Sequence, residues 1–317
     1  GQPNLLFRND GPGPDAASPW KFRELSREAG VLEPEMSFAT WFFDYNNDGW
    51  LDLFVGAWDA ARLGQVAALY LNRRSTAERP RLYLNLGDGR FEDVTGKAGL
   101  DRVLLAMGAN FGDIDNDGFE DVYVGTGATD LWMLIPNRMF RNDGGGRFQD
   151  VTTSGGFGHL QKGHGISFGD VDEDGDQEVY AVMGGWFSGD GFPNALFENP
   201  GHGNHWITLQ LEGVRSNRLA MGTRIQVTVR TESGDREIHR VVGTGGSFGS
   251  SSLQQEIGLG RALSIRSLRI EWPASGVVQV FHDLPMDREV RIREGTETWV
   301  SSAAESFSFP DSKETAR

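Results

Sequence analysis

The chain has 317 residues, of which 38% are hydrophobic, and it carries a formal net charge of −15. This length allows one large or two ordinary domains, and the acidity argues against nucleic acid or an anionic membrane surface as a partner. No cysteine is present, which excludes disulfides, thiolate metal sites and cysteine nucleophiles. No apolar run approaches the roughly 20 residues of a transmembrane helix.

A short motif that ends in asparagine recurs along the first 200 residues and indicates internal repetition. Its copies end at Asn9, Asn85, Asn142 and Asn199, and the last two intervals are both 57 residues. Each unit has the pattern of four short strands, as is typical of β-propeller blades. In the third unit the strands are expected at 105–111, 120–126, 137–142 and 147–152.

An acidic nine-residue loop follows the first strand of each full unit. Oxygen-bearing side chains stand at positions 1, 3, 5 and 9, and glycine at position 6 permits the turn that folds them inward, which suits Ca²⁺. The carbonyl of position 7 would complete the shell. Three copies in one strand context favour about three calcium ions over a merely solvated acidic turn. The predicted ligands are Asp44, Asn46, Asp48, Trp50 and Asp52; Asp113, Asp115, Asp117, Phe119 and Asp121; and Asp170, Asp172, Asp174, Asp176 and Glu178.

These loops are not expected to be EF-hands. Position 12 is Val55, Val124 or Ala181, where an EF-hand needs a bidentate glutamate. The alternating residues that follow each loop predict a strand, so the loop is expected at the tip of a β-hairpin.

Residues 1–200 supply about three and a half units and begin with the second half of a blade. The interval from Asp44 to Asp113 is 69 residues, so an extra loop is expected near 57–80. Two closures remain open: a small ring closed by the chain's own C-terminal strands, or an incomplete ring completed by another chain or a preceding segment. We favour the incomplete ring.

The loop with its preceding Phe-Gly, as at Phe111-Gly112-Asp113 and Phe168-Gly169-Asp170, resembles the FG-GAP or VCBS-type repeats of integrin α-subunit propellers and of many bacterial exported proteins. The first copy departs from the pattern, with Phe43 before the loop and Asn46 at position 3, which should weaken that site. The resemblance implies a propeller whose hairpin loops hold calcium.

The repeat stops after Pro200, and a second all-β module is expected at 201–295, without helical periodicity. It resembles the UnbV/ASPIC domain that follows such repeats in the cartilage acidic protein family and in bacterial homologues. The motifs that match are Ser216-Asn217-Arg218, Met221-Gly222-Thr223-Arg224, Gly245-Gly246-Ser247-Phe248, Ser251-Ser252-Leu253, Gly258-Leu259-Gly260 and Ile270-Glu271-Trp272-Pro273. The domains expected are therefore a repeat region at 1–200, this module at 201–295, and a polar, serine-rich tail at 296–317, held against this chain or a partner.

No catalytic residue is predicted. The pair His202-x-x-His205 has spacing that could suit a transition metal, but it lies in a glycine-rich linker without a third ligand. The serines at 247 and 250–252 lack a nucleophile elbow and favour a polar turn. Tryptophans near the loops could contact a partner or a sugar, but burial between blades is favoured; these are Trp41, Trp50, Trp58, Trp132 and Trp186.

The function expected is a calcium-stabilised binding or scaffold protein that recognises protein or carbohydrate, as an accessory subunit of a larger extracellular or membrane-attached assembly. An exported polysaccharide hydrolase or lyase is the alternative, which would need two metal-free acidic residues across a cleft. Weak calcium sites stay filled only outside the cytoplasm, so a periplasmic, cell-surface or secreted location is expected. The sequence from Gly1 onwards shows no signal peptide. A leader that has been removed and the absence of any leader both remain open.

Overall fold

The computed structural model describes residues 1–13, 20–59, 63–71, 73–130, 135–304 and 306–309. Strands dominate it, which confirms the predicted all-β class, and its helices are α1 (Ser26–Ala29) and α2 (Leu63–Tyr70). Helix α2 occupies the insertion near 57–80, where an extra loop was expected. Neither helix has the length or the apolar character needed to cross a membrane.

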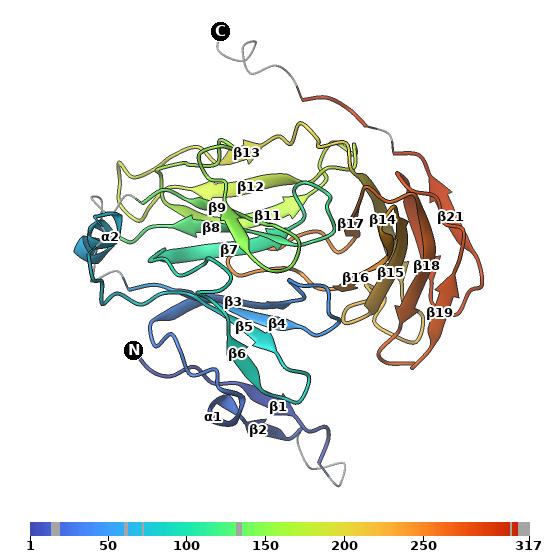
Figure 1. Ribbon diagram of the computed structural model, residues 1–317, viewed down its shortest axis with the longest axis horizontal. Helices are drawn as coiled ribbons and strands as arrows, with labels where there is room; N and C mark the ends of the chain where they lie inside the picture. Colours follow the sequence, from blue (N-terminus) through green and yellow to red (C-terminus); the bar gives the residue numbers. More distant parts are fainter. Residues whose placement is uncertain (14–19, 60–62, 72, 131–134, 305, 310–317) are drawn as a thin grey trace.

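The repeat region forms antiparallel sheets that stack in chain order (Figure 1). At one end, β1 (Phe7–Asn9) pairs only with β2 (Phe22–Glu24), as expected for the second half of a blade. The first full blade contains β3 (Ser37–Phe43), β4 (Asp52–Ala57), β5 (Arg81–Asn85) and β6 (Phe91–Asp93). The second contains β7 (Ala106–Gly112), β8 (Asp121–Thr126), β9 (Arg138–Asn142) and β10 (Phe148–Asp150), within two residues of the strands predicted.

The last blade has three strands, β11 (Gly163–Gly169), β12 (Glu178–Met183) and β13 (Ala195–Phe197), where four were expected. After β13 the chain continues to Pro200 and then into the C-terminal module. A glycine turn follows Asn199, with Gly201 and Gly203 placed as Gly87 and Gly89 are after Asn85, but the Phe-x-Asp strand of the earlier units does not. The edge of β13 is therefore unpaired among the described residues.

Aromatic side chains fill the spaces between blades. Trp41 stacks on Phe54 with ring centroids 4.4 Å apart, and Phe43 lies 5.3 Å from Phe111. All six residues of β8 are buried, because this strand lies in the middle blade with a sheet on each side. Phe43, Phe111 and Phe168, which stand just before the three loops or near them, lie in the core or against it and so take part in blade packing.

The C-terminal module is a sandwich of two four-stranded sheets with its own apolar core. One sheet contains β17 (Gln255–Gly260), β14 (His205–Glu212), β20 (Glu289–Arg293) and β21 (Trp299–Ser302). The other contains β16 (Gly234–Val241), β15 (Arg224–Thr231), β18 (Ser264–Glu271) and β19 (Val278–Phe281). Strand β21 extends the module past residue 295, because the start of the predicted tail pairs antiparallel with β20.

The module lies beside the stack of blades, on the side that carries the acidic loops (Figure 1). From it, the segment 243–253 reaches the innermost blade strands. Ser247 and Ala109 exchange main-chain hydrogen bonds of 2.8 and 3.0 Å, and the Ile166 amide donates to the Phe248 carbonyl at 3.1 Å. Counting the two sheets of the module, the described residues form five sheets of three or four strands besides the β1-β2 pair, against the three and a half units expected from the repeats alone.

Candidate metal centres at the blade tips

The three acidic loops share one hydrogen-bond pattern. In each, the two oxygens of the first carboxylate accept the main-chain amides of positions 5 and 6. These distances are 3.1 and 2.8 Å at Asp44, 3.0 and 2.8 Å at Asp113, and 3.1 and 2.9 Å at Asp170. Position 5 in turn accepts the amide of position 7. The repeated side-chain spacing thus gives a repeated three-dimensional loop.

Backbone conformation explains why position 6 is glycine. It has φ of 86°, 93° and 96° in the three loops, a region that a Cβ strongly disfavours. Position 4 also has positive φ, of 56° at Asn47, 53° at Asn116 and 59° at Glu173. Asparagine tolerates this left-handed conformation better than most residues, which fits two of the three positions.

In the second and third loops the carboxylates of positions 1, 3 and 5 converge. Ligand atoms of Asp113, Asp115 and Asp117 all lie within 4.8 Å of one another, and so do those of the third loop, which starts at Asp170. At position 3, one oxygen of Asp115 and one of Asp172 is buried without a hydrogen-bond partner. Buried oxygens normally have a hydrogen-bond partner. A cation that prefers oxygen ligands would therefore suit both loops, because it would bind the unpartnered oxygen in each.

The first loop differs because Asn46 replaces the position-3 carboxylate. Its amide nitrogen donates to Asp48 at 2.9 Å, so two side chains of the predicted ligand set bond to each other. Only Asp44 and Asp48 supply carboxylates at positions 1, 3 and 5. The expectation that the first loop binds a cation more weakly stays a prediction.

Position 9 does not join these groups. Each of the carboxylates of Asp52, Asp121 and Glu178 accepts the amide of position 2 and the amide of the asparagine at the end of the third strand or just after it. They therefore anchor the loop to its own blade, and their role as ligands stays a prediction. The same holds for the carbonyls of Trp50, Phe119 and Asp176.

Burial raises the pKa of several of the loop carboxyls. The pKa of Asp113 is raised to about 8, that of Asp170 to about 7 and that of Asp52 to about 8, in each case chiefly by desolvation, with neighbouring carboxylates adding to it. Asp121 is raised well above its usual value by burial and by Asp113. Several like charges in a desolvated loop repel one another, and a bound cation would relieve that repulsion.

Asparagine side chains join each loop to the next. Asn47 donates to the Gly118 carbonyl at 2.8 Å, and Asn116 donates to the Gly175 carbonyl at 2.9 Å. From the third strands, Asn142 and Asn199 each donate to a carbonyl of their own loop and to one of the preceding loop. Sequence reasoning noticed these asparagines as repeat markers but did not assign them this bridging role.

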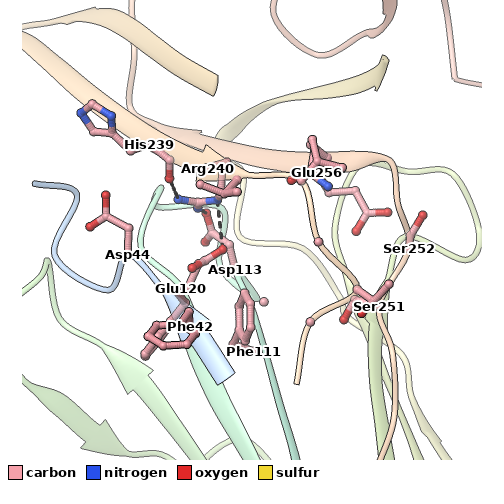
Figure 2. A pocket seen from close by; sticks show the side chains of 18 of the residues that line it. Phe42, Asp44, Phe111, Asp113, Glu120, His239, Arg240, Ser251, Ser252 and Glu256 are labelled. Carbon is pink, nitrogen blue, oxygen red and sulfur yellow. Dashed lines mark hydrogen bonds and ion pairs between the residues drawn. The ribbon is translucent and has the colours of Figure 1, made fainter. Parts of the chain in front are cut away.

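Two arginines of β16 lie against the second loop, and Figure 2 shows one of them, Arg240, beside Asp113 and Glu120. Arg240 is 6% exposed; its Nε lies 3.3 Å from Glu120, and Nη2 lies 3.6 Å from Asp113. Arg236 donates to the Asp117 carbonyl at 2.6 Å. A cavity of about 160 Å³ lies between these loops and the module, lined by Phe42, Asp44 and His239 among others. Sequence reasoning missed both arginines, because 119 or more residues separate them from their partners.

The other candidates lie apart from the loops' carboxylate groups. His205 contacts Asp287 at 2.8 Å within the module, while His202 lines a different cavity. Ser251 accepts from the Asn110 side chain at 2.9 Å in the segment that reaches the blades. Of the tryptophans, Trp41 is buried, whereas Trp50 is 50% and Trp186 is 83% exposed, so burial does not hold for all. Trp132 lies outside the described residues.

Family models agree with this division of the chain. An FG-GAP-like repeat model matches residues 44–124 and 125–181, and an ASPIC and UnbV model matches residues 213–298. No curated protein matches the chain. The first model covers the acidic loops with their blades, and the second covers most of the C-terminal sandwich. The chain therefore contains FG-GAP-like repeats followed by a C-terminal ASPIC and UnbV domain.

Proposed function

We propose that the protein is a calcium-stabilised scaffold that works outside the cytoplasm and binds a protein or carbohydrate partner without catalysing a reaction. The combination of FG-GAP-like repeats with an ASPIC and UnbV domain fits a binding or scaffold role. The observation that carries the calcium assignment is the buried carboxylate oxygen without a hydrogen-bond partner at position 3 of the second and third loops.

Calcium suits these loops better than most cations. Each offers oxygens only, arranged in a flexible turn, and open sites of this kind bind in about the 10⁻⁴–10⁻³ M range. Transition metals prefer nitrogen or sulfur ligands, and no histidine or cysteine stands among the predicted ligands. At ten times its Kd, each ion would stabilise the fold by about 1.4 kcal/mol. Such weak sites stay filled in an extracytoplasmic setting.

The role proposed for the ions is mechanical. The loops are bonded to one another through Asn47, Asn116 and Asn142, and to the module through Arg236 and Arg240. An ion that fixes each loop would therefore fix the spacing of the blades and the position of the module, and the resulting rigid surface would be available to a partner.

Thermal unfolding in calcium and in chelator tests this proposal. We expect the midpoint to rise with calcium and to respond much less to equimolar magnesium, because Mg²⁺ demands stricter octahedral geometry. The Asp115→Asn and Asp172→Asn double variant should lose most of the calcium response. Asp88→Asn, on an exposed turn outside the loops, is the matched control and should keep it. A midpoint that is the same in calcium and chelator would refute the proposal.

A further inference from the structure

The fourth strand of a blade also covers the preceding blade. In the second blade, the Phe148 amide donates to the Ala98 carbonyl of the first blade at 2.8 Å. A Cβ on Gly99 would lie only 3.1 Å from the Phe148 carbonyl oxygen. The same contact recurs one blade earlier, where a Cβ on Gly30 would lie 3.4 Å from the carbonyl oxygen of Phe91.

The side chain of this fourth strand fills the outer part of the space between blades. Phe148 is 5% exposed and belongs to the core cluster that includes Val94, Ala98 and Leu100. Its ring centroid lies 6.1 Å from that of Tyr45, at position 2 of the first acidic loop. An aromatic residue on the outermost strand thus closes the junction between the first and second blades.

No described residue closes the junction between the second and third blades in that way. A cavity of about 780 Å³ is lined there by Ile114, Val151, Gly155 and Phe157. Ile114 stands at position 2 of the second loop, and the other three stand 57 residues after Val94, Ala98 and Leu100. Nothing lies within 4 Å of a Cβ built on Gly156, the counterpart of Gly99. This outer groove is the space where a fourth strand of the third blade would lie.

We propose that an extended segment of a partner protein binds in the outer groove as a fourth strand, antiparallel to β13, and inserts an aromatic side chain into the cavity. Addition of a strand to a free sheet edge is an established mode of peptide recognition. The proposal deepens the binding role given above and rests on it.

The neighbouring blade gives the register and the chemistry of the partner. There, Phe148 lies opposite Asn142, and Gln149 opposite Arg141. In the third blade the aromatic residue would lie opposite Asn199 and the next residue opposite Glu198, so a basic residue is favoured after the aromatic one. Pro200 has no amide to donate, so pairing would centre on Glu198 and Leu196.

The chain's own segments fit the groove less well. In the tail, the Phe307 amide already donates to the Asp172 carbonyl at 3.0 Å. The residues after Phe307 and Phe309 are serine and proline, which offer no charge to Glu198. A second copy could supply Phe91 or Phe148 only by removing a strand from its own blade. Of these three occupants, a separate partner protein fits the groove best.

Peptide binding to the full chain in millimolar calcium tests the proposal by fluorescence anisotropy. The probe is a labelled peptide with the sequence of residues 145–153 and Gln149→Lys, and the control peptide also has Phe148→Ala. We expect the aromatic peptide to bind at least about tenfold more tightly, from burial of one phenyl side chain. In the protein, Glu198→Pro removes the edge amide while Glu198→Ala removes only the charge, so the proline variant should bind at least about tenfold more weakly than the alanine variant.

Equal affinity of both peptides, or no binding to a protein whose unfolding midpoint still rises with calcium, would overturn the strand-addition proposal and leave the calcium proposal standing. A chain that ends at Ser302 separates the possible occupants. If the peptide binds only after this truncation, the tail fills the groove and the partner assignment is wrong. Concentration-dependent self-association that the peptide abolishes would assign the groove to a second copy, and would equally contradict it.

Discussion

The buried guanidinium of Arg240 offers the sharpest test of how the module is held on the blades. Its side chain is 5% exposed and faces Glu120, which is 10% exposed, and Asp113, which is 2% exposed. Arg240→Met keeps most of the side-chain volume but leaves both carboxylates without their buried cation. Removal of one partner from such a pair costs about 3 kcal/mol or more, so we expect a loss of about 3 kcal/mol in the free energy of unfolding.

A double-mutant cycle with Glu120→Gln shows whether the ion pair is the cause. Urea denaturation in millimolar calcium should show that the double variant is more stable than the sum of the single losses implies, with a coupling of about 1–2 kcal/mol. Burial raises the pKa of Glu120 to about 7 even though Arg240 opposes the shift. Without Arg240, the Glu120 carboxyl would be protonated at low pH and would carry an unpaired buried charge at high pH. The loss of unfolding free energy in Arg240→Met should therefore grow as the pH rises from 6 to 9. Strictly additive losses, or a deficit below about 0.5 kcal/mol, the range of ordinary surface changes, would refute this reasoning.

Three further predictions concern other parts of the fold. Asn142→Ala leaves two buried loop carbonyls without a donor, so urea denaturation should show a loss of about 2–3 kcal/mol; an unchanged midpoint would exclude the bridging role. Gly118→Ala should lower the unfolding midpoint and weaken calcium binding, because φ is +93° and the added Cβ would meet the Gly258 carbonyl at 3.0 Å, whereas Gly146→Ala, in open space, should change neither. Burial opposes ionisation of Glu294, but hydrogen bonds from a serine side chain and three amides outweigh it and lower the pKa to about 2. The stability this carboxylate contributes should thus be present above about pH 4.5 and be lost as the pH falls towards 2, and acid titration of Glu294→Gln should lack this transition.

Much of the fold was predictable because the residues that repeat along the chain make contacts with residues close to them in sequence. The spacing of Asp113, Asp115 and Asp117 predicts one tight turn. Gly118 is part of the same signal, because its φ of 93° strongly disfavours any residue with a Cβ. The strand after the loop could be predicted because its few residues have the alternating pattern of a β-strand. For the same reason the strands of the second blade were expected within two residues of where they lie.

The contacts between blades and with the module could not be predicted, because they join residues distant in sequence through geometry that only the folded chain creates. Nothing in the sequence around Arg240 distinguishes it from other arginines on β-strands. Its role follows only from the position of β16 against the second loop. The bridging role of Asn116 depends on the approach of Gly175 from the next blade. The missing strand after Asn199 did have a signal, the absence of the Phe-x-Asp pattern that follows Asn85 and Asn142. The helix in the insertion near 57–80 had none in the repeat pattern.

Direct calcium binding to the full chain, measured by isothermal titration calorimetry on chelator-treated protein, tests the central claim. The account predicts two sites of similar affinity, from the second and third loops, and a weaker one from the first. Asp115→Asn and Asp172→Asn should each weaken one of the two similar sites to about the affinity of the first loop, which has Asn46 at the same position. Absence of binding up to millimolar calcium, by a protein that remains folded, would contradict the account.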